Sequence, residues 1–91
     1  MAHTKTDKET KELSRKSKVY TLMLYNDDFN TFEHVIDSLI RVCGHSKEQA
    51  EQCTFLVHYV GKCDVKRGSL KELKPFMAAL SERGLTAEIK E

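Results

Sequence analysis

The sequence lacks any long apolar run and any large excess of one charge. No stretch approaches the ~18 apolar residues that a membrane-spanning helix needs, and the N-terminus has no apolar centre of the kind found in signal peptides. The chain carries 15 lysines and arginines against 14 aspartates and glutamates, a net charge of +1. This balance argues against a basic surface for nucleic acid or an anionic membrane. We therefore expect a cytoplasmic protein with no nucleic acid and no membrane among its partners.

Cysteine is also scarce, and no two cysteines form a CxxC pair. The three, Cys43, Cys53 and Cys63, are an odd number, which argues against a secreted disulfide framework and fits a reducing compartment. His45 and His58 lie nearby in the sequence, but structural zinc ligands usually come as close pairs and none occurs here. We expect ordinary thiols, no metal site and no cofactor.

The length of 91 residues allows one domain. Residues 1–17 are charged and almost free of large apolar side chains, so they cannot offset the entropy lost on ordering. We predict a disordered N-terminal tail over 1–17 and a folded core over 18–91. A core of this size buries roughly 60% of its unfolded surface and is only marginally stable.

Local patterns predict the element order β-α-α-β-α-β. Residues 19–25 are rich in β-branched and aromatic side chains and apolar on both faces, which is typical of a central strand. Three helices are indicated, because each start has a capping residue three positions before an acid or amide, and each end has a glycine. The start pairs are Asn30 with Glu33, Ser46 with Gln49, and Ser69 with Glu72, and the glycines are Gly44, Gly61 and Gly84.

Helical stripes of apolar residues provide the predicted core. They are Phe32, Val35, Ile36, Leu39 and Cys43 in the first helix, Ala50, Cys53, Val57 and Val60 in the second, and Leu73, Phe76, Met77 and Leu80 in the third. Pro75 interrupts the third pattern and predicts a kink there or a helix that starts there. Residues 62–66 and 85–90 alternate and predict two short strands with one wet face. The fold class is therefore α+β, a two-layer domain with three helices packed on a small antiparallel sheet.

The most unusual residues are Asn26, Asp27 and Asp28, which follow the first strand. They are compatible with an ordinary turn of solvated acids, and His58 is compatible with a half-exposed residue of the second helix. Together they suggest a binding site, because a protein α-amino group is mostly an ammonium with three donors at neutral pH and needs acceptors when buried. An Asn carbonyl, an ionised Asp and a neutral His nitrogen supply three acceptors and one compensating charge. We predict that Asn26, Asp27 and His58 bind a protein N-terminus, with no catalytic residue.

Two segments of the chain carry motifs of a known protein family. Residues 24–33 read Leu-Tyr-Asn-Asp-Asp-Phe-Asn-Thr-Phe-Glu and resemble a motif of an apolar pair, Asn-Asp-Asp, an aromatic, Thr-Pro-Met and an acid, which is the first signature of the ClpS family of N-degron adaptors. Residues 55–61 resemble the second signature, which is Val-His, two further residues and Gly. The separation of the two segments also matches, and the similarity extends from about Lys18 to the C-terminus.

The resemblance implies an adaptor, not an enzyme. Such an adaptor binds N-degron peptides or proteins, which begin with a bulky apolar residue, and delivers them to the N-terminal domain of an AAA+ Clp unfoldase of the ClpA or ClpC type. It implies that Asn26, Asp27 and His58 hold the α-amino group of the substrate. The residues that it places around the first side chain are Asn30, Thr31, Phe32, Val35, Thr54, Val57 and Leu85, although plain core packing also explains Val35 and Val57.

The sequence departs from the family pattern in three places. Asn30-Thr31-Phe32 replaces Thr-Pro-Met, so an aromatic ring takes the place of a flexible thioether beside the pocket. Thr54 stands where the family has a pocket Met. Residues 62–76 differ from the family segment that meets the unfoldase.

Two other functions are compatible with a domain of this kind. A non-degradative interaction module like the C-terminal domain of the ribosomal stalk protein would share the fold, but it would need neither Asn-Asp-Asp nor Val-His. A small hydrolase would use Cys43 or Cys63 with His58, but the sequence has no oxyanion-hole signature.

Overall fold

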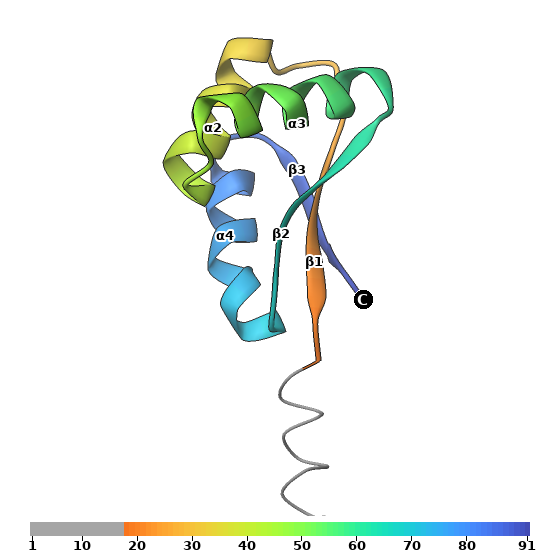
Figure 1. Ribbon diagram of the computed structural model, residues 1–91, viewed down its shortest axis with the longest axis vertical. Coiled ribbons are helices and arrows are strands. Elements are labelled where there is room, and N and C mark those ends of the chain that lie inside the picture. Colours follow the sequence, from red (N-terminus) through yellow and green to blue (C-terminus); the bar gives the residue numbers. More distant parts are fainter. Residues whose placement is uncertain (1–17) are drawn as a thin grey trace, which may run out of the picture.

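The structure confirms the predicted α+β fold and its element order. The computed structural model describes residues 18–91, and the tail predicted over 1–17 lies outside them. The elements are β1 (Tyr20–Tyr25), α2 (Phe32–Cys43), α3 (Lys47–Tyr59), β2 (Lys62–Gly68), α4 (Leu70–Glu82) and β3 (Thr86–Lys90). Figure 1 shows α4 alongside the sheet, with α2 and α3 gathered at the end where β1 finishes.

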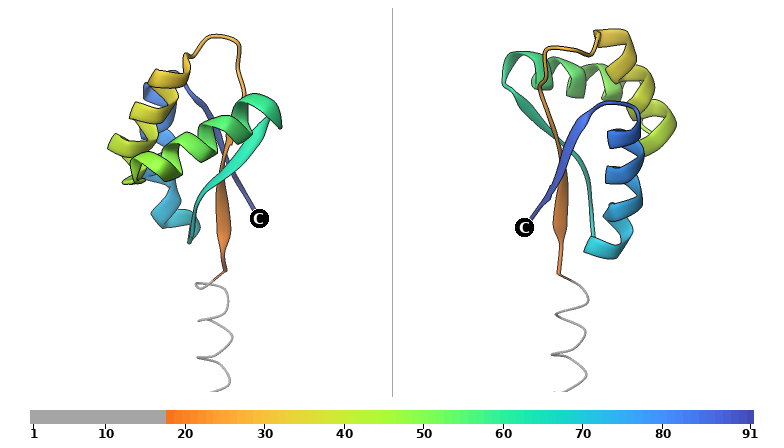
Figure 2. Two further views of the ribbon diagram at one scale, coloured as in Figure 1. Left: turned by 45° about the horizontal axis from the view of Figure 1, so that its top comes forward. Right: turned by 180° about the vertical axis from the view of Figure 1, so that it is seen from behind.

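β1 is the central strand of a three-stranded antiparallel sheet with the order β2-β1-β3. Leu22 and Leu24 of β1 are fully buried in the core, whereas Met23 and Tyr25, which point to the other face, are half-buried. The helices lie on one side of the sheet (Figure 2). Because the helices within residues 18–91 cover only one face, β2 and β3 alternate more buried and more exposed residues, as the sequence pattern predicted.

The starts of α3 and α4 agree with the predicted capping. The Ser46 and Ser69 hydroxyls accept hydrogen bonds from the backbone amides of Gln49 and Glu72. The side chains of Gln49 and Glu72 accept in return from the backbone amides of the two serines. These reciprocal pairs are capping boxes, which satisfy donors that a helix start otherwise leaves unpaired.

The predicted start of α2 is wrong by one residue. Thr31, not Asn30, is the N-cap, and its hydroxyl accepts from the His34 amide at 3.1 Å. Asn30 does not cap the helix because its side-chain amide donates to Asp27 and to the Gly84 carbonyl. The difference matters for function, since both partners of Asn30 adjoin the candidate site.

Two further expectations about the helices need correction. Of the two alternatives at Pro75, a helix start is wrong, because Pro75 lies inside α4, which runs unbroken from Leu70 to Glu82; a kink there stays a prediction. The fully buried Leu73 and Leu80 anchor this helix on both sides of the proline, and their burial offsets the hydrogen bond that proline removes. Val60 was expected in the core but is 66% exposed at the end of α3.

Residues 18–91 contain no helix that is long and apolar enough to cross a membrane. The three cysteines are free thiols: Cys53 and Cys63 are buried and Cys43 is half-buried. Within the same residues no group of three or more His, Cys, Asp or Glu side chains is placed to hold a metal ion.

Candidate functional site

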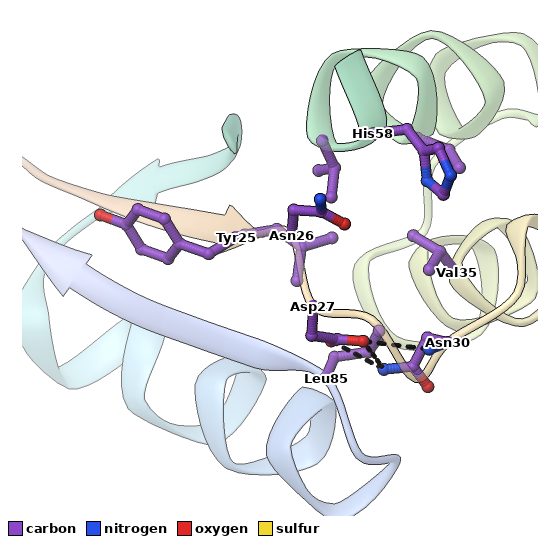
Figure 3. A pocket seen from close by; sticks show the side chains of 10 residues that line it. Tyr25, Asn26, Asp27, Asn30, Val35, His58 and Leu85 are labelled. Carbon is purple, nitrogen blue, oxygen red and sulfur yellow. Dashed lines mark hydrogen bonds between the residues drawn. The ribbon is translucent and has the colours of Figure 1, made fainter. Parts of the chain in front are cut away.

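A small cavity lies where the end of β1 meets α3 and the turn before β3 (Figure 3). Its volume is about 10 Å³, which is about the space that one water molecule needs. The lining residues are Leu24, Tyr25, Asn26, Asp27, Asn30, Val35, Thr54, Val57, His58 and Leu85. The cavity thus brings together the three residues predicted to hold an α-amino group and five of the seven predicted around the first side chain.

A backbone hydrogen bond sets Asn26 beside the end of α3. The Asn26 N–H donates to the Gly61 carbonyl at 3.0 Å, directly beyond the last paired residues of β1 and β2. Gly61 has a φ of +105°, which residues with a side chain rarely adopt, so glycine suits this tight turn. Because His58 lies in the last turn of α3, this bond holds Asn26 and His58 near each other.

The side chains of Asn26 and His58 reach toward the same space from different elements (Figure 3). Neither is hydrogen-bonded to another of the residues drawn there, and both residues are exposed. The amide oxygen of Asn26 and a ring nitrogen of His58 are therefore available as acceptors for a ligand.

The carboxylate of Asp27 is held in place by its own loop. Its Oδ1 accepts from the Phe29 amide at 2.9 Å, the Asn30 amide at 3.0 Å and the Asn30 side chain at 2.9 Å, and its Oδ2 accepts from the Asn30 side chain at 2.8 Å. Partial burial raises the pKa of Asp27, but these hydrogen bonds and the nearby His34 together hold that pKa below its ordinary value. Asp27 is therefore ionised at neutral pH, and its Oδ2 keeps a lone pair for one more donor.

Asn30 joins this loop to the turn that precedes β3. The nitrogen of its side chain, which donates to Asp27, also donates to the Gly84 carbonyl at 2.9 Å. The next residue, Leu85, is 5% exposed and forms part of the cavity wall. Asn30 thus fixes the position of the Asp27 charge relative to the apolar wall at Leu85.

A second set of contacts, which the sequence analysis missed, holds the same turn from α2. Nε2 of His34 lies 2.7 Å from the Arg83 carbonyl oxygen. The Arg83 guanidinium donates to Ser38 Oγ and to Asp37 Oδ2, each at 2.7 Å. These partners are 45 to 49 residues apart in the sequence, so no local pattern indicates them.

The rest of the cavity wall is apolar and closely packed. Val35, Val57 and Leu85 are each at most 6% exposed, and Thr54 is 1% exposed. The Thr54 hydroxyl donates to the Ala50 carbonyl at 2.7 Å, so its proton is used within α3. The wall therefore offers apolar contact and no hydroxyl donor.

Thr31 and Phe32, which were also predicted around the first side chain, are not among the lining residues. Thr31 is exposed and caps α2. The ring of Phe32 packs edge-on against His58, with centroids 4.5 Å apart, and against Phe55, at 5.4 Å. Phe32 therefore borders the cavity through His58. Asp28, the third residue of the acidic motif, is exposed and does not line the cavity.

Leu24 and Tyr25 line the cavity although the sequence analysis did not assign them to it. Leu24 faces the core because residues of a strand alternate between its faces. The ring of Tyr25 points away from the space between Asn26 and His58 (Figure 3). The strand at 19–25 was visible in the sequence, but the place where the cavity forms was not.

Comparison with known proteins establishes the family. A family model described as "ATP-dependent Clp protease adaptor protein ClpS" matches residues 15–88. The chain belongs to the ClpS family. The resemblance noted from the two sequence signatures is thereby confirmed.

ClpS relatives named "ATP-dependent Clp protease adapter protein ClpS" cover most of the chain. The protein of Nostoc sp. is 33% identical over 87 residues, which span 93% of this chain and 90% of that protein. The protein of Synechocystis sp. is 31% identical over 81 residues, with 88% and 83% covered. The protein of Sodalis glossinidius is 33% identical over 70 residues, 75% of this chain and 66% of that protein. These relatives are named as adapters and not as enzymes.

A solved ClpS structure shares the fold. Agrobacterium tumefaciens ClpS2 bound to L-phenylalaninamide matches with a TM-score of 0.68 over 80% of this chain and 95% of that chain, at 24% identity. The three helices and three antiparallel strands in the order β-α-α-β-α-β are therefore the ClpS fold.

Proposed function

We propose that this ClpS-family chain is an adaptor that binds the free N-terminus of another protein and delivers that protein to a Clp unfoldase and its peptidase. The placement of Asn26, Asp27 and His58 around one cavity carries the proposal. The side chains of Asn26 and His58 are not hydrogen-bonded to the other residues drawn in Figure 3, so each can accept from a ligand. Asp27 is an ionised carboxylate with a spare lone pair.

An N-terminal ammonium matches this set of acceptors. It has three N–H donors and one positive charge, and the site offers Asn26 Oδ1, a neutral His58 nitrogen and the charged Asp27 Oδ2. Hydrogen bonds to a charged group each contribute about 1.5–3 kcal/mol. Acetylation removes the charge and two donors from the ligand, and it leaves the acceptors of the site unpaired. A blocked N-terminus should therefore be rejected strongly.

The apolar wall supports selection of a bulky apolar first residue. Val35, Thr54, Val57 and Leu85 surround the space next to the three acceptors, and burial of apolar surface contributes roughly 25 cal/mol per Å². The cavity volume of about 10 Å³ is too small for a large side chain, so these walls move apart when one enters. Binding of L-phenylalaninamide by ClpS2, an amino acid amide with a free amine and an aromatic side chain, supports this class of ligand.

Delivery is supported by the family rather than by the cavity. The relatives are adapters of the ATP-dependent Clp protease, and we assign the partner as the N-terminal domain of a ClpA or ClpC type unfoldase in the cytoplasm. The family segment that meets the unfoldase corresponds to residues 62–76, which span β2 and the first half of α4.

The other two functions have less support. No cysteine is among the residues that line the cavity with His58, so a thiol hydrolase has no nucleophile at this site. A non-degradative interaction module would not require Asn26, Asp27 and His58 to meet at one cavity.

The test compares two peptides that differ only at the amine. A fluorescent peptide that begins with Phe should bind, and the same peptide with an acetylated N-terminus should bind several orders of magnitude more weakly. Asn26→Ala and His58→Ala should each abolish measurable binding while circular dichroism stays unchanged. His45→Ala is the matched control, because His45 lies before α3, at the opposite end of the helix from His58. Equal binding of the free and acetylated peptides would overturn the proposed function.

A further inference from the structure

A second, larger hollow lies between α2 and α3. It has a volume of about 430 Å³, whereas the cavity has about 10 Å³. We call it the α2–α3 groove, and its lining residues are Phe32, Glu33, Ile36, Asp37, Ile40, Lys47 and Glu51. Phe32, Ile36 and Ile40 are spaced by four residues and form one apolar stripe along α2, about 12 Å long at 1.5 Å per residue.

Four rings connect this groove to the cavity. We call Phe32, Phe55, His58 and Tyr59 the aromatic rim. The Phe32 centroid lies 4.5 Å from that of His58 and 5.4 Å from that of Phe55, and Tyr59 lies 5.8 Å from Phe55 and 5.9 Å from His58. His58 lines the cavity and Phe32 lines the groove, so their contact makes the two hollows neighbours.

The aromatic rim exposes much more apolar surface than folding alone requires. Phe55 is 52% and Tyr59 is 75% exposed, and contiguous exposed apolar surface of this kind marks interaction sites. In the groove, the Asp37 carboxylate is already paired with Arg41 at 2.8 Å and with Arg83 at 2.7 Å. The remaining charges are two glutamates and one lysine, so the groove favours an apolar occupant over a strongly charged one.

The distance that a bound substrate extends from the cavity indicates which part of it occupies the α2–α3 groove. If the ammonium of a substrate lies among Asn26, Asp27 and His58, its following residues must leave the cavity past the rim. An extended chain advances about 3.3–3.6 Å per residue, so residues 2 and 3 reach the rings that lie within 6 Å of His58. About two or three more residues would reach the stripe of α2. Apolar contacts are non-directional, which suits an adaptor whose substrates differ after their first residue.

We propose that the aromatic rim and the α2–α3 groove form a second subsite, which binds residues 2 to about 5 of the captured protein as an extended apolar segment. This proposal rests on the proposed function, since it requires the first residue to occupy the cavity. Under this proposal, the affinity for a captured protein depends on its residues 2 to about 5 as well as on its first residue.

The experiment uses three ligands with the same first residue. They are phenylalaninamide, a hexapeptide amide with Phe followed by Leu, Val, Leu, Gly and Ser, and a hexapeptide amide with Phe followed only by Gly and Ser. Isothermal titration calorimetry on the full chain should show that the apolar peptide binds at least tenfold more tightly than the Gly-Ser peptide. The Gly-Ser peptide should bind within about twofold of phenylalaninamide.

Single substitutions test which residues provide the tenfold gain in affinity of the apolar peptide. Tyr59→Ser and Ile40→Ser should each remove most of the tenfold gain and leave the affinity for phenylalaninamide within twofold. Leu70→Ser is the matched control, because Leu70 is 38% exposed and Ile40 is 37% exposed, and Leu70 begins α4 at the end of the domain away from α2 and α3 (Figure 1). The control should retain the full gain.

The outcomes separate the two proposals. If none of the three ligands binds, the proposed function fails and the second subsite fails with it. If phenylalaninamide binds but the two hexapeptides bind equally, or if Leu70→Ser loses the gain as Ile40→Ser does, only the second subsite is overturned. If Ile40→Ser keeps the gain and instead abolishes self-association in sedimentation, the groove binds a second copy of the chain and the proposal is wrong.

Discussion

Replacing Asn30 with alanine should destabilise the domain through the loss of a clamp between two loops. The side chain of Asn30 donates to both oxygens of Asp27, at 2.9 and 2.8 Å, and to the Gly84 carbonyl at 2.9 Å. Hydrogen bonds to a charged group contribute about 1.5–3 kcal/mol and neutral ones about 0.5–1.5 kcal/mol. Because these groups are only partly buried, water replaces some of the lost bonding. We expect Asn30→Ala to lower the free energy of unfolding by about 2 kcal/mol, or the melting temperature by roughly 8–16 °C for a domain of this size.

The pH dependence of this loss is specific to Asp27. The folded pKa of Asp27 is below its ordinary value, so its ionised form stabilises the fold above the ordinary pKa, and this stabilisation is lost as pH falls through the folded pKa. In Asn30→Ala the folded pKa of Asp27 should rise toward its ordinary value, because the side-chain hydrogen bond that lowers it is gone. The difference between the two proteins should be full at pH 7 and should shrink below about pH 4.

Urea unfolding followed by circular dichroism at pH 7 and pH 3.5 measures both quantities. Asn26→Ala is the control, because the Asn26 side chain is not bonded to the other residues drawn in Figure 3, and it should change the stability by less than about 0.5 kcal/mol. An Asn30→Ala protein as stable as the wild type, or a loss of stability that is the same at both pH values, would show that Asn30 does not stabilise the fold through Asp27 and Gly84.

Three further predictions concern binding. Phe32→Met should broaden the range of accepted first residues, because a thioether adapts to different shapes whereas the Phe32 ring is packed against His58. Binding of peptides that begin with Phe, Tyr, Trp and Leu tests this prediction. Equal affinity of the wild-type protein for all four would contradict it. His58→Phe should lose measurable peptide binding, because a phenyl ring can still pack against Phe32 but has no nitrogen to accept a hydrogen bond; retained affinity would exclude His58 as an acceptor. Alkylating the native protein with iodoacetamide should leave peptide affinity within about twofold, because Cys53 and Cys63 are buried; loss of binding would reopen a role for a thiol.

The order of elements was predictable because local patterns specify it. Apolar residues on both faces of 19–25 indicated a central strand, and β1 lies between β2 and β3. Ser46 and Ser69 were recognisable caps because their partners lie three residues away. Asn30 was misassigned because the same side chain can cap a helix or bond to a neighbouring carboxylate, and only the position of Asp27 decides between them.

The cavity itself was predictable only in part. Residue types suggested that Asn26, Asp27 and His58 act together, and the structure places all three at one cavity, although their role in binding stays a prediction. The contacts that assemble the site were not predictable, since the bonds from Asn26 to Gly61 and from His34 to Arg83 join distant segments. A sequence pattern reports periodicity within one element and carries no information on which turns meet.

Because the cavity is nearly closed, selectivity for the first residue depends on the cost of opening the cavity as well as on fit. A ligand that needs room can bind only the open form, so the observed dissociation constant equals the intrinsic one divided by the open fraction; an open population of about 1% would weaken every such ligand about a hundredfold. A short first side chain avoids this penalty because it needs no room, but it also gains little apolar contact inside the cavity. A large first residue is therefore selected only when its contact energy exceeds the cost of opening, and until such a ligand arrives the apolar wall of the cavity stays out of water.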